Sequence, residues 1–179
     1  MSQTAKWVID PTHSEVQFKI KHLVISSLTG FFKSYEGFLT TEGDDFENAY
    51  AEFSIDVASI DTTQDARDKH IVGEDFFDVA NYPKISFKST SIKKVDTENY
   101  EMTGDLTIKG ITKSEKLKVY FGGEAVDFYG NPKAGFEVSG TVNRKDYNLL
   151  WDGITEAGSI VVGPEVKLLI NTQVIKQKD

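Results

Sequence analysis

One short segment, residues 14–23, limits the fold of this chain more than any other. Its sequence is S-E-V-Q-F-K-I-K-H-L, in which Val16, Phe18 and Ile20 alternate with polar and charged side chains. A period of two residues is typical of a β-strand with one buried face and one solvated face. Such a strand buries its apolar face only against other elements, so the segment predicts a sandwich or a barrel.

The same alternation recurs over most of the 179 residues, with turn-forming Gly, Asp and Asn between the runs. No repeat or linker divides the chain, so we predict a single all-β domain of residues 1–179 with eight or nine strands. An eight-stranded barrel leaves room for one small ligand, whereas a sandwich fills its centre, and the pattern fits both. We expect strands at residues 7–9, 14–22, 33–41, 49–60, 84–95, 100–108, 117–121, 134–142 and 161–175.

Two segments lack this alternation. Residues 64–72 follow polar cap-type residues and precede Gly73, which are start and stop signals of a short α-helix. Residues 23–29 carry apolar side chains at a spacing closer to that of a helical turn. We expect this second segment to form an apolar cap.

The chain is acidic, with a formal charge of −8. Its longest run of cations is the pair Lys93-Lys94, so the basic surface that nucleic acids require is missing. An acidic surface also repels anionic membranes and anionic ligands at long range. Any bound anion would therefore need a local group of cations.

Cysteine is absent, which excludes disulfides, thiol catalysis and thiolate metal sites. The first residues contain no cationic run followed by an apolar segment, and no stretch approaches about 18 apolar residues. We therefore expect no transmembrane segment. We also expect a cytoplasmic location, or a periplasmic one if a leader has been removed.

Residues 65–70, D-A-R-D-K-H, bring Arg, Lys and His within four positions. In an acidic protein this cluster is a candidate anion site. A guanidinium matches two phosphate oxygens at once, so Arg67 is the candidate ligand for a charged head group. The alternative is a solvated helix face on which Arg67 pairs with a carboxylate.

The three histidines, His13, His22 and His70, lack a metal-ligand spacing, and we expect neither a metal nor another cofactor. His13 lies in a turn, where local hydrogen bonding is the expected role. His22 shares a strand face with apolar residues, which predicts either a place at the mouth of an interior space or a buried histidine. Counting by twos from Phe136 reaches Arg144, which predicts a cation at the rim unless a bulge turns it to solvent.

Four blocks of the sequence occur in an order that is specific to one family. With them the chain resembles the YceI-like polyisoprenoid-binding family from Trp7 to about Val174. The resemblance implies an extended, eight-stranded, antiparallel, lipocalin-like barrel with one short helix, usually as a homodimer, whose tunnel takes an isoprenoid or another long aliphatic chain. The blocks are D-P-T-H-S-E-V-Q-F-K-I-K-H-L, A-R-D-K-H with D-F-F-D-V-A-N-Y-P-K-I-S-F-K-S, G-D-L-T-I-K-G-I-T-K and R-K-D-Y-N-L-L-W.

Carried onto this sequence, the resemblance implies a polar end for the ligand's head group and an apolar tunnel. Asn148 stands where the family usually has glycine, and asparagine tolerates the positive φ of such a turn. The candidate head-group residues are His13, Ser14, His22, Arg67, Asp68, His70 and Arg144. The candidate tunnel residues are Phe18, Ile20, Phe76, Phe77, Tyr82, Phe87 and Trp151, to which the aromatic content and the strand pattern add Phe32, Phe53, Leu106 and Phe136.

We therefore hypothesise a non-catalytic protein that binds, stores or transports a long-chain lipid, such as a polyisoprenoid or an isoprenoid quinone precursor. Burying one five-carbon unit is worth roughly 3–4 kcal/mol at ~0.8 kcal/mol per carbon. One alternative is a small isomerase or hydrolase that acts on a lipid in the cavity with His22 or His70 as proton carrier. Another is an interaction protein that uses a sheet edge or a dimer face.

Overall fold

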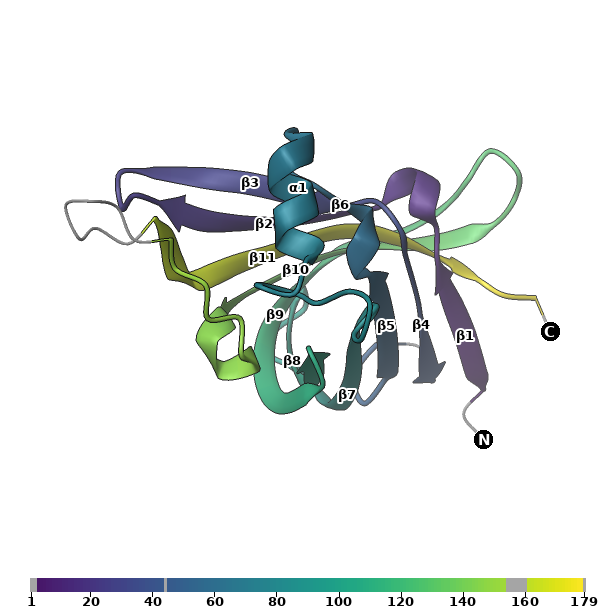
Figure 1. The fold of residues 1–179 in the computed structure, drawn as a ribbon. Helices are drawn as coiled ribbons and strands as arrows, with labels where there is room; N and C mark the ends of the chain where they lie inside the picture. Colours follow the sequence, from purple (N-terminus) through teal and green to yellow (C-terminus); the bar gives the residue numbers. More distant parts are fainter. Residues whose placement is uncertain (1–2, 44, 154–160, 179) are drawn as a thin grey trace.

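The computed structural model describes residues 3–43, 45–153 and 161–178, which form mainly antiparallel strands (Figure 1). Within these residues the connections contain the α-helix α1 (Asp65–Val72) and the 3-10 helices η1 (Pro11–His13), η2 (Val57–Ser59) and η3 (Arg144–Tyr147). The strands are β1 (Thr4–Ile9), β2 (Glu15–His22), β3 (Ser26–Phe32), β4 (Tyr35–Glu42), β5 (Tyr50–Asp56), β6 (Ile60–Asp61), β7 (Lys84–Lys94), β8 (Asn99–Ile108), β9 (Ile111–Val126), β10 (Pro132–Asn143) and β11 (Val162–Lys176).

Eight of the strands close into an antiparallel barrel, as the resemblance implies. Their order is β1-β4-β5-β7-β8-β9-β10-β11, and the ring closes where Trp7, Val8 and Ile9 of β1 pair with the end of β11. Because the ring is closed, the dry faces of all eight strands point at a common interior. The eight-stranded barrel that the resemblance implies is therefore confirmed, and the sandwich that the strand pattern also allowed is wrong.

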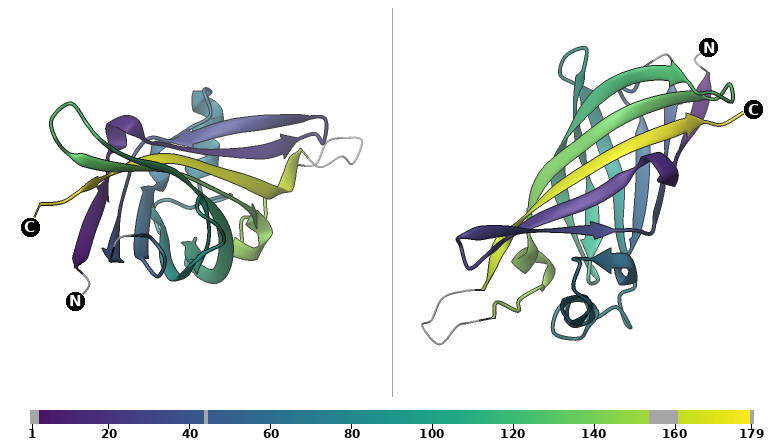
Figure 2. Two further views of the ribbon diagram at one scale, coloured as in Figure 1. Left: turned by 180° about the vertical axis from the view of Figure 1, so that it is seen from behind. Right: turned by 90° about the horizontal axis from the view of Figure 1, so that it is seen from above.

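The long strand β11 pairs with two strands on its side away from β10. Its first part, residues 162–171, pairs with β2, and β3 and β6 continue outward from β2. Figure 2 shows β2 and β3 as a hairpin that extends beyond one end of the barrel, while the β9–β10 hairpin extends beyond the other. The extended outline comes from these two hairpins.

The helical turn expected at residues 23–29 is wrong. Residues 26–32 form β3, which pairs with β2 in register from Val16↔Phe32 to His22↔Ser26. The backbone hydrogen bonds of this pairing outweigh the local spacing of the apolar side chains. The helix expected at residues 64–72, in contrast, is confirmed as α1, and the described residues contain no helix of the length and apolarity that a bilayer crossing requires.

Glycine gives two inward-facing rings the space that they occupy. A Cβ atom on Gly30 would collide with the ring of Phe18, and one on Gly104 would collide with the ring of Phe87. Gly30 lies directly opposite Phe18 on the neighbouring strand, whereas Gly104 pairs with Ser89 and lies diagonally across from Phe87. A side chain at either position would push an aromatic ring out of the wall of the barrel.

Candidate functional site

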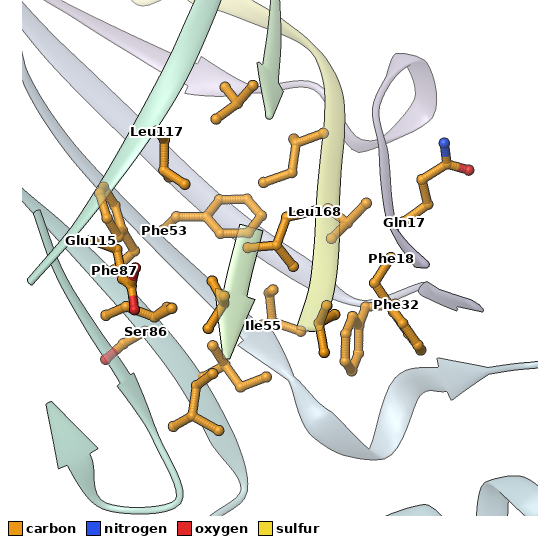
Figure 3. Close-up of a pocket in the computed structure, with 18 of the residues that line it drawn as sticks. Gln17, Phe18, Phe32, Phe53, Ile55, Ser86, Phe87, Glu115, Leu117 and Leu168 are labelled. Carbon is orange, nitrogen blue, oxygen red and sulfur yellow. The ribbon is translucent and has the colours of Figure 1, made fainter. Parts of the chain in front are cut away.

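A cavity of about 380 Å³ occupies the interior of the barrel. Small-molecule pockets in proteins usually have roughly 300–1,000 Å³, so the space is large enough for a ligand. Figure 3 shows Phe53, Leu117 and Leu168 pointing into a common space, with Phe18 and Phe32 at its side. The strands thus line an interior that their side chains leave partly unfilled.

Most of the predicted tunnel residues line this cavity. Tyr82 does not, because it lies in the connection after α1, is 38% exposed and packs its ring against Gly110 at the β8–β9 turn. The others all face the cavity: Phe18, Ile20, Phe32, Phe53, Phe76, Phe77, Phe87, Leu106, Phe136 and Trp151.

Apart from Ile20 and Leu106, the aliphatic part of the lining was not predicted from the sequence. These residues are the inward members of the same alternating runs, so strand parity was the signal that would have found them. They include Ile55, Ile85, Met102, Leu117, Leu168 and Ile170.

Aromatic rings close one end of the cavity, which we call the floor. Phe46, from the β4–β5 connection, lies with its ring centroid 5.6 Å from that of Trp7, 5.1 Å from that of Phe121 and 4.9 Å from that of Phe136. The separations fit attractive edge and tilted packing of aromatic rings. Phe46 is 5% exposed, so a residue that the sequence places in a loop is a main part of the floor.

Cationic side chains surround the opposite end, which we call the mouth. Arg67 of α1 lines the cavity there, and it donates from Nε to the Thr62 hydroxyl at 2.8 Å and from Nη2 to the Thr62 carbonyl at 2.6 Å. Among the described residues Arg67 has no ion pair, which differs from the surface pairing that the sequence left open. Asp68 lies outside the lining, and its carboxylate accepts from the Thr62 amide at 3.0 Å.

Arg144 also reaches the mouth, but its guanidinium N–H groups donate to carbonyl and carboxylate oxygens of the protein itself. Nε donates to the Gly163 carbonyl at 2.7 Å, Nη1 to the Leu149 carbonyl at 2.5 Å, and Nη2 to Asp152 at 2.7 Å and to the Val162 carbonyl at 2.9 Å. The side chain is 1% exposed, and these bonds fasten η3 to the start of β11. Arg144 therefore faces inward, as strand counting predicts, and serves as a structural clamp of the mouth.

The three histidines lie in two different surroundings. His22 and His70 both line the mouth, and the His70 ring meets the ring of Trp151 edge-on with the centroids 4.6 Å apart. His13 and Ser14 lie outside the cavity lining. The described residues contain no cluster of His, Cys, Asp and Glu that fits a metal ion.

His13 and Ser14 instead belong to a network around the buried carboxylate of Asp10. Asp10 interacts with His13 Nδ1 at 2.8 Å and accepts from Lys133 Nζ at 2.9 Å, while the Ser14 hydroxyl donates to the Asp10 carbonyl at 2.7 Å. Burial acts to raise the pKa of Asp10, but hydrogen bonds from Thr12, Lys133 and His13 together hold it well below its usual range. This network joins the end of β1 to β10 and places these two residues away from the mouth of the cavity.

The carboxylate of Glu115 lies at the cavity, and the sequence offered no reason to expect it there. Glu115 of β9 lines the cavity and accepts a hydrogen bond at 2.7 Å from the hydroxyl of Tyr147, which is fully buried. Burial, and then the bond to Glu115, raise the pKa of Tyr147. Among 28 acidic residues nothing local in the sequence marks Glu115, because only strand parity turns it inward.

Comparison with known proteins identifies the fold family. The YceI-like domain matches residues 7–174 of the chain. The chain belongs to the YceI-like family. Protein YceI of Escherichia coli is 37% identical to this YceI-like chain over 169 residues, which are 93% of this chain and 83% of that protein.

Two solved structures share the barrel of this YceI-like protein. Burkholderia cenocepacia BcnA aligns with a TM-score of 0.80 and 23% identity, over 92% of this chain and 98% of that one. A polyisoprenoid-binding domain from Saccharophagus degradans, implicated in plant cell wall breakdown, aligns with a TM-score of 0.70 and 17% identity, over 96% and 98% of the two chains. Both confirm the fold.

Proposed function

We propose that this protein binds one long apolar chain inside the barrel and acts as a carrier or store, without catalysing a reaction of it. The observation that carries the proposal is the unfilled cavity, whose walls are almost entirely hydrocarbon from residues such as Phe53, Leu106 and Leu168. Transfer of apolar carbon from water to such walls is worth ~0.8 kcal/mol per carbon. The solved relative described as a polyisoprenoid-binding domain supports an isoprenoid as the ligand.

The mouth suits a ligand with an anionic head group. Arg67 uses Nε and one Nη2 hydrogen on Thr62, so its remaining guanidinium hydrogens are available to an anion at the mouth. Guanidinium is the side-chain group that best matches a phosphate. We propose that the apolar chain lies along the barrel toward the floor and that Arg67 binds its head, with His22 and His70 beside it.

The direct test is organic extraction of the purified protein followed by mass spectrometry. Because a handful of isoprene units brings the gross burial energy near the practical affinity ceiling of about −20 kcal/mol, we expect a long-chain lipid to survive purification. Repeated preparations that contain no lipid, and that take none up from detergent micelles, would contradict the proposal.

A matched pair of variants separates a cavity from a filled core. Val138→Phe adds an aromatic ring to the cavity wall, whereas Val95→Phe makes the same change at an exposed position. In an open interior, Val138→Phe blocks lipid uptake and leaves the melting temperature close to that of Val95→Phe. In a filled core it would instead cost about 1–3 kcal/mol of stability through overpacking.

Three expectations from the sequence stay predictions. They are the homodimer, the cytoplasmic location, and the lipid-directed isomerase or hydrolase that uses His22 or His70. The enzyme hypothesis is tested by lipid turnover. If the wild type converts a bound lipid and the His70→Ala variant does not, the enzyme hypothesis replaces the carrier proposal.

A further inference from the structure

The tip of the β2–β3 hairpin, residues 23–25, departs from two local rules at once. Leu23 and Val24 have φ angles of 53° and 64°, a region that glycine, asparagine and aspartate usually occupy and that a β-branched side chain disfavours. Val24 and Ile25 are also 77% and 85% exposed. Polar turn residues would form this hairpin with less strain, so folding alone does not account for Leu-Val-Ile here.

Apart from Glu15 at the far end of β2, the two strands behind the tip carry positive charge only. Residues 16–32 contain Lys19 and Lys21 but no Asp or Glu, in a chain whose formal charge is −8. Lys19 lies directly opposite Lys167 of β11, and like charges in that position repel. Within the described ranges none of these three lysines forms an ion pair. Among the described residues, the part of the hairpin nearest the tip thus presents positive charge that no ion pair neutralises.

This cationic hairpin lies directly beside the mouth of the cavity. Lys21, His22 and Val161 line the cavity, and the amide of Leu23 donates to the carbonyl of Val161 at 2.8 Å. Figures 1 and 2 show the hairpin reaching outward from the mouth end of the barrel. An exposed apolar tip and a set of unpaired cations therefore lie next to the entrance of an apolar interior.

We propose that the β2–β3 hairpin docks on the surface of an anionic phospholipid bilayer. Val24 and Ile25 enter the boundary between head groups and acyl chains, while Lys19, Lys21 and Lys167 meet the lipid phosphates. Screening limits the repulsion from distant carboxylates to about 8 Å at physiological salt, so the net charge of the protein does not prevent this local contact. Docking places the mouth against the bilayer. Val24 and Ile25 do not line the cavity, so this surface stands apart from the proposed ligand.

The β9–β10 hairpin supplies an internal control. Its tip exposes Phe128 and Tyr129, which are 98% and 86% accessible, but Glu124 and Asp127 flank them. The two tips thus present exposed apolar side chains beside charges of opposite sign. An anionic surface selects the β2–β3 tip, whereas unspecific adhesion of apolar groups would not distinguish the two.

The experiment is flotation of the full chain with vesicles of phosphatidylcholine mixed with phosphatidylglycerol, and with vesicles of phosphatidylcholine alone. We expect binding to the anionic vesicles that weakens as salt is raised.

Val24→Asn/Ile25→Ser lowers the partition coefficient about 10- to 100-fold, since two apolar side chains leave the lipid. Asparagine accepts the positive φ of residue 24, so this variant folds at least as well. Lys19→Gln/Lys21→Gln lowers anionic binding about fivefold for each lysine.

Phe128→Ser/Tyr129→Ser removes as much exposed apolar surface and leaves vesicle binding unchanged. Three outcomes would overturn the proposal. The first is a wild-type protein that stays with the soluble fraction. The second is an equal loss in the variants of both tips. The third is a Val24→Asn/Ile25→Ser protein with unaltered vesicle binding that sediments as a smaller species, because the tip would then be a contact between two copies of this chain.

Discussion

The two ends of the barrel are closed by different chemistry. At the floor, Phe46 packs among Trp7, Phe121 and Phe136, so aromatic rings fill the space between the strands. At the mouth, α1 and η3 place Arg67 and Arg144 at the edge of the cavity. Under the proposed carrier function, this difference gives the ligand a direction, with its apolar chain toward the aromatic end and its head group at the charged end.

The mouth itself contains two arginines with different tasks. Arg144 is buried and its hydrogen bonds end on the protein's own carbonyl groups and on Asp152. Within the part of the chain that the structure describes, the side-chain hydrogen bonds of Arg67 go to Thr62 alone. Burial and partner count therefore separate a cation that holds the mouth together from one that is free to bind a ligand.

The largest expected effect is that of Arg144→Ala. Removal of the guanidinium takes its donor from the carbonyls of Leu149, Val162 and Gly163 and leaves Asp152 with Lys145 alone, so we expect a loss of about 3–5 kcal/mol in the free energy of unfolding. Urea denaturation measures it. The control is Lys145→Ala, which removes the exposed second partner of Asp152 and changes stability little. Equal stability of the two variants would show that Arg144 is no clamp.

Arg67→Ala tests whether the second arginine of the mouth binds the ligand's head group. It removes a charge-assisted partner from the mouth and leaves the floor intact, so we expect the affinity for a phosphorylated long-chain lipid to fall by about 1.5–3 kcal/mol. Affinity for the neutral lipid of the same chain length stays unchanged. Lys69→Ala, an exposed change on the same helix, is the control, and fluorescence titration measures all three. A wild-type protein that binds both lipids equally would contradict a head-group site at Arg67.

A smaller effect concerns pH and the network beside the floor. The folded protein holds the pKa of Asp10 below its ordinary value of 3.8, so the ionised carboxylate stabilises the fold at any pH above that value. The stabilisation is lost as the pH falls from about 3.8 through the folded pKa. We expect Asp10→Asn to cost about 1–2 kcal/mol at neutral pH and less at low pH.

Thermal unfolding of the wild type and of Asp10→Asn across the acidic range measures this difference. The two melting curves should converge as the pH is lowered below 3.8. A gap that stays constant over that range would show that the network around Lys133 and His13 does not depend on the charge of Asp10.

Strand parity made much of the lining predictable from the sequence. The alternation of Val16, Phe18 and Ile20 places all three on the inner face of β2, and Phe87 and Leu106 follow the same rule in β7 and β8. Parity works because side chains of a strand alternate between its faces regardless of what the strand pairs with. At residues 23–29 the helical spacing of the apolar side chains gave the wrong expectation, because the pairing of residues 26–32 with β2 decides the structure there.

The sequence by itself determined an all-β chain with an apolar inner face, since a period of two is a local property of the backbone. Only the tertiary structure decided that the interior stays open, that Phe46 closes one end and that Arg67 rather than Arg144 keeps donors for a ligand. Each of these depends on contacts between residues far apart in the chain. Local sequence patterns do not specify such long-range contacts. Only the packing therefore distinguishes Arg144, which holds the mouth together, from Arg67, which keeps guanidinium hydrogens without a partner among the described residues.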